Sequence, residues 1–172
     1  MRTSNARKVR LLILDIDGVM TDGGLQFDNQ GEEYKTFNSL DGHGIRMLLD
    51  CGIEVAVITG RNSGIVSHRM NDLGVKHIYQ GNRDKLPAFE KLLQETGLDP
   101  EQAAYVGDDL PDLPIMRRVG LAIAVQNAHV FVKQHCDWVT TACGGKGAVR
   151  EVTDFILQAQ SLLKAAQDSY LE

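Results

Sequence analysis

The chain has 172 residues, of which 43% are hydrophobic and 24% charged, and its formal net charge is -5. This size and composition are typical of one globular domain with a real core, so we expect a single domain over residues 1–172. The acidic balance argues against general binding to nucleic acids or membrane surfaces, because both need a basic field. An anionic substrate would therefore need a local cluster of cations.

The N-terminal ten residues are basic and are followed by a short apolar run, LLIL, with Asp15 and Asp17 directly behind it. That arrangement fits neither a signal peptide nor a membrane span, and we expect a cytoplasmic protein. The cysteines are three in number and form no CxxC pair. This pattern favours free thiols over disulfides or a zinc site.

Short, continuous apolar runs predict strands that are covered on both faces, as in a parallel sheet. In chain order these strands are expected at residues 9–14, 55–58, 77–79, 103–106, 121–125 and 138–139. Helical patterns separate them, at residues 44–50, 63–73, 85–96, 113–119 and 148–166. This alternation predicts right-handed crossovers and a Rossmann-like, doubly wound, mainly parallel α/β sheet.

One stretch after the first strand breaks this alternation. Residues 25–37 alternate in polarity around Asn29-Gln30-Gly31, which is typical of a β-hairpin. We therefore expect a hairpin flap at about residues 24–37, where a helix would otherwise follow the strand.

Polar side chains follow three of the predicted strands. Asp15 and Asp17 follow the first, Thr59 the second and Asp108 a later one, while Lys85 opens a helix. Ligands of open α/β sheets bind beyond the carboxyl ends of the strands, so these groups are expected to converge on one edge.

These residue types suit phosphoryl transfer. Asp15 and Asp108 offer the hard oxygen ligands that Mg²⁺ or Mn²⁺ accepts. Asp15 can also attack phosphorus in line, and Asp17 can act as general acid and base. Thr59 and Lys85 can hold the phosphoryl oxygens. Taken singly, each motif has a plainer interpretation as a solvated turn or a helix cap.

The order of the motifs resembles the haloacid dehalogenase superfamily. The matching segments are LLILDIDG (11–18), VAVITG (55–60), Lys85 and AYVGDDLPD (104–112). The resemblance implies that Asp15 is nucleophile and Mg²⁺ ligand and that Asp17 is the acid/base, with its backbone carbonyl on the metal. It further implies that Asp108 is the third ligand and that Asp109 and Asp112 orient metal-bound waters.

The spacing of the motifs leaves no room for a cap domain over the site. Asp15 and Thr59 are 44 positions apart, and Thr59 and Lys85 are 26 apart. The chain thus resembles the capless branch of the superfamily, in which neighbouring subunits cover each other's sites, and a homotetramer is implied. The alternative is a monomer with an open site that acts on a macromolecule.

Within this branch the chain resembles the family of phosphatases that act on 3-deoxy-D-manno-octulosonate 8-phosphate in lipopolysaccharide precursor synthesis. The matching segments are TDG (21–23), FNSLDGHGIRML (37–48), ITGR (58–61), YQGNRDKL (79–86), AYVGDDLPDLPIM (104–116) and GGKGAVREV (144–152). The substrate site implied by the resemblance comprises Asp17, Asn38, Ser39, Leu40, Asp41, Gly42, Arg46, Thr59, Gly60, Arg61, Arg69 and Lys85.

Arginines suit a substrate with a carboxylate and a phosphate, although Arg46 and Arg69 could equally lie on a solvated helix face. The chain departs from the family at Asn38-Ser39-Leu40, where a Val-Arg pair often precedes Asp-Gly.

A glycine-rich tail segment, Gly144, Gly145, Lys146 and Gly147, allows two interpretations. It is either a flexible loop before the last helix or a segment that approaches a neighbour's site.

Three rival functions remain at this point. A related phosphatase could take another sugar acid phosphate, such as a nonulosonate 9-phosphate. A signalling receiver domain has similar groups, but its acidic pair and lone aspartate come in a different order. A degenerate scaffold is disfavoured because the catalytic residue types are intact.

Overall fold

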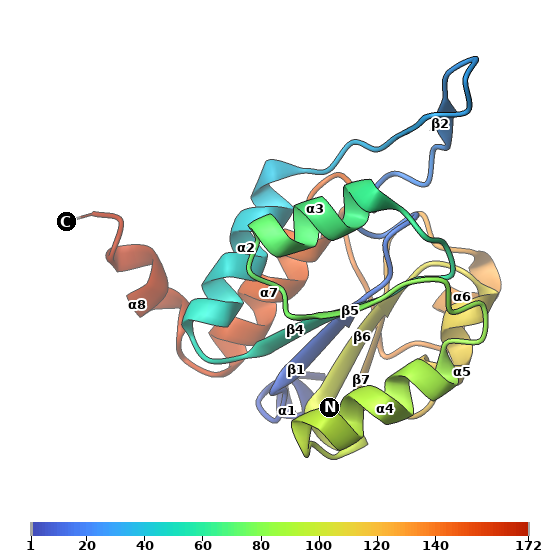
Figure 1. Cartoon of the computed structure of the whole chain (residues 1–172). Helices are drawn as coiled ribbons and strands as arrows, with labels where there is room; N and C mark the ends of the chain where they lie inside the picture. Colours follow the sequence, from blue (N-terminus) through green and yellow to red (C-terminus); the bar gives the residue numbers. More distant parts are fainter. Residues whose placement is uncertain (1, 172) are drawn as a thin grey trace.

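The computed structural model describes residues 2–171 and shows a parallel sheet between two layers of helices (Figure 1). Six strands form the sheet in the order β5-β4-β1-β6-β7-β8, and every neighbouring pair is parallel. Their bounds are β1 (Leu11–Leu14), β4 (Glu54–Ile58), β5 (His77–Tyr79), β6 (Ala103–Gly107), β7 (Leu121–Ala124) and β8 (Trp138–Val139). The predicted doubly wound fold is confirmed.

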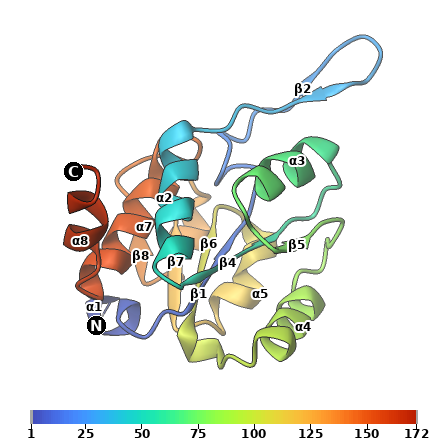
Figure 2. The ribbon, with the colours of Figure 1, turned by 60° about the vertical axis from the view of Figure 1, so that its left-hand side comes forward.

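The helices pack on both faces of this sheet, which is why its central strands are apolar throughout. They are α1 (Arg2–Ala6), α2 (Ser39–Asp50), α3 (Gly64–Asp72), α4 (Leu86–Thr96), α5 (Leu113–Met116), α6 (Val130–Lys133), α7 (Ala148–Ala159) and α8 (Leu163–Asp168). Figure 2 shows α1, α2, α7 and α8 on one side of the sheet and α4 and α5 on the other. Helix α3 lies on the side of α2, where Arg69 and Leu73 pack against Gly42 (Figure 1). Short 3₁₀ turns at Pro100–Gln102 and Leu110–Asp112 flank β6.

The predicted hairpin is present and projects from the body of the protein (Figure 1). Its strands β2 (Gln26–Phe27) and β3 (Glu33–Tyr34) pair antiparallel. Within the described chain, the segment between Asp15 and Thr59 holds only this hairpin, α2 and β4, and that between Thr59 and Lys85 only α3 and β5. The fold is therefore capless, as expected from the spacing.

The predicted bounds of α2 were wrong at its start. The helix begins at Ser39 rather than at residue 44, because Asn38 caps it: its side-chain oxygen accepts a hydrogen bond from the Leu40 N–H at 2.8 Å. An asparagine cap with an acidic residue in the first turn is a recognisable start signal, and Asp41 supplies that acid. Residues 38–42, expected to line the substrate site, are thus the cap and first turn of a helix.

Other differences concern short helices. The helix expected at residues 148–166 is interrupted after Ala159, because Ser161 adopts the left-handed conformation at φ 62° and Leu162 N–H turns back to the Leu157 carbonyl at 2.8 Å. The helix expected at 113–119 ends at Met116. Helices α1 and α6 were not expected, since four or five residues carry too little periodicity to be recognised.

Two further features agree with the sequence analysis. Cys51, Cys136 and Cys143 are all free thiols. Among residues 2–171, none of the helices combines the length and apolar character needed to cross a bilayer.

Candidate active site

The register of the sheet brings the three strand-end motifs together. Leu14, the last residue of β1, is aligned with Val57 of β4 and Val106 of β6. Asp15, Thr59 and Asp108 therefore emerge at the same edge. They open onto a cavity of about 470 Å³. Its lining comprises Asp15, Asp17, Thr59, Gly60, Arg61, Arg83, Lys85, Asp108, Asp109, Pro111 and Asp112.

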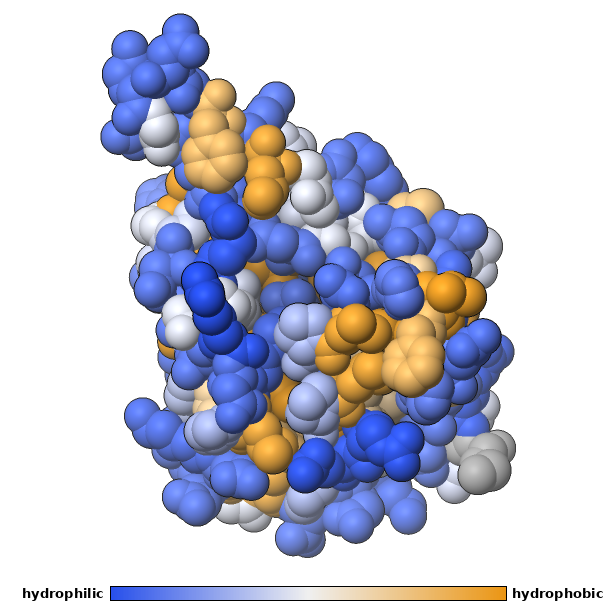
Figure 3. All heavy atoms as spheres, turned by 90° about the vertical axis from the view of Figure 1, so that its right-hand side faces the viewer, coloured by the Kyte–Doolittle hydropathy of each residue, from blue (hydrophilic) through white to orange (hydrophobic). Residues whose placement is uncertain are grey.

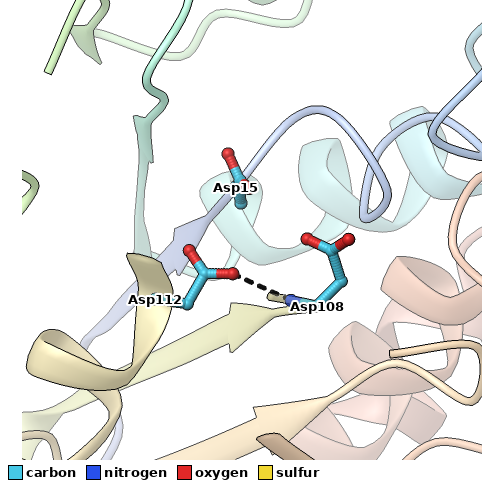
Figure 4. Close-up of side chains that lie close together, drawn as sticks. All are labelled: Asp15, Asp108 and Asp112. Carbon is cyan, nitrogen blue, oxygen red and sulfur yellow. Dashed lines mark hydrogen bonds between the residues drawn. The ribbon is translucent and has the colours of Figure 1, made fainter. Parts of the chain in front are cut away.

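Three carboxylates lie closest together in this cavity. Each of Asp15, Asp108 and Asp112 offers an oxygen within 4.8 Å of the others, and Figure 4 shows the three groups around a common space. Asp15 follows β1, Asp108 follows β6, and Asp112 ends the 3₁₀ turn after it. Such an arrangement concentrates negative charge in a small volume, and nearby cations are needed to offset the repulsion between the carboxylates.

Lys85 supplies one of these cations. Its side chain is only 4% exposed, and its Nζ lies 3.0 Å from Asp15 Oδ1 and 2.7 Å from Asp112 Oδ1. Burial alone would lower the pKa of Lys85, but the charges of Asp15 and Asp112 outweigh burial and raise it. Lys85 therefore stays protonated between the two carboxylates.

Asp112 is the hub of a buried hydrogen-bond network. Its Oδ1 also accepts a hydrogen bond from the hydroxyl of Tyr105 at 2.7 Å. Its Oδ2 accepts the backbone N–H groups of Asp108 at 2.9 Å and Asp109 at 3.1 Å (Figure 4). With both oxygens occupied, Asp112 fixes the loop that carries Asp108. Tyr105 is fully buried on β6. The sequence analysis did not single it out, because its position in an apolar run predicts a core residue.

The acidic groups of the cluster are shifted toward their protonated forms. Burial, then the charge of Asp112, raises the pKa of Asp15 to about 6, against the opposing effect of Lys85. Burial, followed by the charges of Asp112 and Asp15, raises the pKa of Asp108 to about 8. The single positive charge of Lys85 thus does not balance the charges of the three carboxylates. A divalent cation would relieve the repulsion that remains between them.

The donor set fits a hard divalent metal ion. Asp108 Oδ1 is buried and has no hydrogen-bond partner among the described residues, so it has a free lone pair for a ligand. Gly18, at φ 96°, brings the backbone so close that an added Cβ would lie 2.1 Å from Asp108 Oδ2. Carboxylate oxygens at this spacing suit Mg²⁺, which keeps waters and substrate phosphate as its other ligands.

A second group of charges reaches the site from the hairpin, and sequence reasoning missed it. Lys35 forms an ion pair with Asp17 Oδ1, and its Nζ lies 3.2 Å from Glu33 Oε1. Arg61 donates from Nη2 to Glu33 Oε1 at 2.7 Å, while its Nε lies 3.7 Å from Asp17 Oδ2. The alternation of the hairpin indicates strands but gives no sign that Lys35 meets Asp17 or that Glu33 meets Arg61.

Part of the expected substrate segment is buried away from the cavity. Asp41 has no exposed surface, and its carboxylate accepts the backbone N–H of Arg150 at 2.8 Å, in the first turn of α7. Burial raises the pKa of Asp41, although the amides of α7 favour its ionised form. In this structure the Asp41 carboxylate faces α7 and does not line the cavity, so its contact with a substrate stays a prediction. Its place is that of a cap for α7.

The neighbours of Asp41 also lie outside the cavity. Asn38 caps α2, Ser39 is its first helical residue, Gly42 is buried against Arg69, and Leu40 is 59% exposed. None of them is among the residues that line the cavity.

Two of the expected arginines are likewise absent from the cavity lining. Arg46 is exposed and donates to the Leu73 carbonyl at 3.2 Å. Arg69 pairs with Asp72 at 2.9 Å and packs on Gly42. By contrast Arg61 does line the cavity, together with Arg83, which the sequence analysis did not single out.

The glycine-rich tail segment packs on the loop that follows β1 of the same chain. A Cβ on Gly144 would lie 1.7 Å from the Gly18 carbonyl oxygen, and one on Gly145 would lie 2.5 Å from Asp22 N. Gly145 N–H donates to the Val19 carbonyl at 2.9 Å. These contacts explain the glycines by close approach of two backbones. Contact with a neighbour's site stays a prediction.

Fold and site together define a hydrolase of the haloacid dehalogenase type, and residues 73–149 match the family model described as haloacid dehalogenase-like hydrolase. The chain is 51% identical over 164 residues to the 3-deoxy-D-manno-octulosonate 8-phosphate phosphatase KdsC of Escherichia coli (strain K12). The alignment covers 95% of this chain and 87% of that protein. The chain belongs to this 3-deoxy-D-manno-octulosonate 8-phosphate phosphatase family.

Solved structures agree with this assignment. The phosphatase of that name from Yersinia pestis superposes with a TM-score of 0.94 at 50% identity, covering 95% of this chain and 88% of that one. The Moraxella catarrhalis phosphatase was solved in complex with a magnesium ion, a phosphate ion and a KDO molecule. It superposes with a TM-score of 0.96 at 40% identity, covering 98% of this chain and 97% of that one.

Proposed function

We propose that this protein is a Mg²⁺-dependent phosphatase that hydrolyses 3-deoxy-D-manno-octulosonate 8-phosphate to the free sugar acid and inorganic phosphate. The observation that carries the proposal is the cluster of Asp15, Asp108 and Asp112 around Lys85, at an edge where three strands end. Relatives about half identical to this chain are named for this hydrolysis, and a further one at 40% identity was solved with magnesium, phosphate and KDO.

In this proposal the reaction has two steps at Asp15. A carboxylate oxygen of Asp15 attacks phosphorus, and the bond from phosphorus to the sugar oxygen breaks as Asp17 gives that oxygen a proton. Water then attacks the aspartyl-phosphate and transfers a proton to Asp17. Phosphate leaves, and the Asp15 carboxylate is restored.

The surrounding groups stabilise charge. Lys85 and the backbone and hydroxyl of Thr59 face the phosphoryl oxygens, whose charge spreads in the transition state. Mg²⁺, held by Asp15, Asp108 and the carbonyl of Asp17, neutralises the phosphate and fixes it for in-line attack. Asp112 and Asp109 hold the loop that presents Asp108.

We propose that Arg61 contributes to recognition of the substrate beyond its phosphate. Arg61 lines the cavity and suits a carboxylate or phosphate oxygen. Arg46, Arg69 and the exposed start of α2 lie outside this cavity, so any contact they make with the sugar would be at a site completed by another subunit.

A homotetramer is the proposed assembly. Figure 3 shows apolar side chains at the base of the hairpin and over the face that carries α5 and α6. Large apolar residues that are at least 46% exposed there include Leu25, Phe27, Tyr34, Leu110, Val130 and Phe131. Apolar surface of this kind supports burial in an assembly. Sedimentation analysis is expected to give about four times the monomer mass of 19.0 kDa. A monomer at micromolar concentration would contradict it.

That residues 1–172 form one domain and that the protein is cytoplasmic stay predictions from the sequence.

The test of the proposed function is phosphate release from a panel of sugar phosphates, with Mg²⁺ and with EDTA. The panel contains the octulosonate 8-phosphate, a nonulosonate 9-phosphate and hexose phosphates. We expect preference for the octulosonate, abolished by EDTA. In Asp15→Asn we expect kcat to fall by more than about 10³-fold. Asp50→Asn, an exposed carboxylate on α2, serves as the matched control. Preference for another sugar would contradict the substrate, and metal-independent release would contradict the mechanism.

A further inference from the structure

The hairpin is tied to the body at the active site. Its contacts with the body include the ion pair of Lys35 with Asp17, the hydrogen bond of Arg61 to Glu33, and Arg61 stacked over Phe27 at 5.8 Å. All three involve Asp17 or Arg61, and both of these residues line the cavity. The position of the hairpin and the position of the Asp17 carboxylate are therefore set together.

Lys35 stands out on this hairpin because its side chain is only 2% exposed, whereas Phe27 and Tyr34 are more than half exposed. A lysine is almost never buried to this extent unless it is paired. The desolvation of its ammonium must be offset by close partners, and the partners here are Asp17 and Glu33. The buried Lys35 thus holds the Asp17 carboxylate in place.

The two oxygens of Asp17 are held differently. Oδ1 takes the ion pair with Lys35. Oδ2 lies 3.7 Å from Arg61 Nε, which is beyond hydrogen-bond distance. Lys35 thereby fixes one oxygen and leaves the other free to carry a proton toward the cavity that Asp17 lines.

We infer that Lys35 is a positioning residue for the reaction: it orients the Asp17 carboxylate so that its free oxygen protonates the sugar oxygen that leaves phosphorus. This inference rests on the proposed function. In the step concerned, the bond from Asp15 to phosphorus forms, the bond from phosphorus to the sugar oxygen breaks, and the Asp17 proton passes to that oxygen. The free sugar hydroxyl and an ionised Asp17 result.

A purely structural tether and a positioning role differ in their dependence on the leaving group. A sugar alkoxide is a poor leaving group and needs the proton from Asp17. A p-nitrophenolate delocalises its charge and leaves without one. Loss of Lys35 as a positioning residue would therefore slow the sugar phosphate selectively, whereas a damaged fold, phosphate site or metal site would slow both substrates alike.

The experiment compares kcat/KM for the octulosonate 8-phosphate and for p-nitrophenyl phosphate in wild type, Lys35→Met and Lys35→Arg. Removing well-placed acid catalysis costs about 10²-fold or more, and we expect that loss for the sugar phosphate in Lys35→Met. For p-nitrophenyl phosphate we expect a change within about threefold. Lys35→Arg keeps a cation that can donate to Asp17 and is expected to recover the sugar phosphate to within about tenfold of wild type.

Two controls separate the possible causes. Lys91→Met removes an exposed lysine of α4 and is expected to match wild type with both substrates. The rise in melting temperature caused by Mg²⁺ is expected to be the same in Lys35→Met and wild type, because the metal site is intact. Equal losses with both substrates, no loss with either, or a lost response to Mg²⁺ would each overturn the role of Lys35. A wild type without metal-dependent phosphatase activity would instead overturn the proposed function.

Discussion

The two charged regions that meet at the cavity are built in different ways. The strand-end cluster of Asp15, Lys85, Asp108 and Asp112 is largely buried and fixed by the register of adjacent parallel strands. The hairpin cluster, in which Glu33 and Lys35 join Asp17 and Arg61, comes from a projection whose neighbouring side chains are exposed.

This difference in burial predicts different roles for the two clusters. Charges in the strand-end cluster act in a low-dielectric environment, so each is costly to remove and the groups shift each other's pKa. In the hairpin cluster only Lys35 is almost fully buried. Arg61 is 42% exposed, so its ion pairs are partly screened by water and contribute little to stability. We therefore expect the first cluster to dominate stability and metal binding, and the second to act mainly on proton transfer.

The largest effect is expected from Lys85→Met. It leaves Asp15 and Asp112 unpaired in a buried site, and breaking a buried pair costs about 3–5 kcal/mol of the free energy of unfolding. Loss of its charge next to the phosphoryl group should also lower kcat by about 10²-fold. Urea unfolding and initial rates measure both effects. Lys91→Met on α4 is the matched control, expected to change stability by less than about 0.5 kcal/mol; equal stability of the two variants would contradict the comparison.

The next effect concerns Mg²⁺ and pH. The raised pKa values of Asp15, about 6, and Asp108, about 8, mean that these two carboxylates bind more protons in the metal-free folded protein than in the unfolded chain from about pH 4 to pH 8. Their contribution to stability therefore falls as pH rises through this window. Mg²⁺ replaces the protons, so we expect it to raise the melting temperature more at pH 8 than at pH 5.5. An equal rise at both values would contradict the coupling of these carboxylates to the metal.

A smaller effect is expected from Asp41→Ala, which tests the buried carboxylate that the sequence placed in the substrate site. Loss of the cap on α7 should lower the free energy of unfolding by about 1–2 kcal/mol. The KM for the sugar phosphate should stay within about twofold of wild type, because the side chain is fully buried. A large rise in KM with unchanged stability would contradict the role as a cap and support direct substrate contact.

The smallest effect on stability is expected from Glu33→Gln in the hairpin cluster. Its partner Arg61 is 42% exposed, and Lys35 keeps Asp17 as a partner, so the free energy of unfolding should change by less than about 1 kcal/mol. The Mg²⁺-induced rise in melting temperature should also be unchanged. A loss above about 2 kcal/mol would show that the hairpin is as integral to the fold as the strand ends.

The fold and the strand-end cluster could be predicted from the sequence because both follow from local signals. Continuous apolar runs gave the parallel strands, and Asp15, Thr59 and Asp108 each follow one of them directly. Parallel strands end at a common edge, so placing the motifs on the chain was enough to bring them together in space.

The hairpin contacts and the role of Asp41 could not be predicted in this way. Lys35 meets Asp17 across 18 positions of sequence, a contact that alternation does not encode. Asp41 reaches α7 across 109 positions of sequence. An acidic residue in a motif-like segment indicates a polar partner but does not say whether that partner is a substrate or a helix end.

The most direct test of the central claim is to trap the covalent intermediate. The enzyme is mixed with Mg²⁺ and the sugar phosphate, quenched with borohydride, which reduces an aspartyl-phosphate to homoserine, and mapped by peptide mass spectrometry. The account expects homoserine at position 15, dependent on substrate and Mg²⁺ and absent in Asp15→Asn. Phosphate release without reduction at Asp15, or reduction at a different carboxylate, would contradict it.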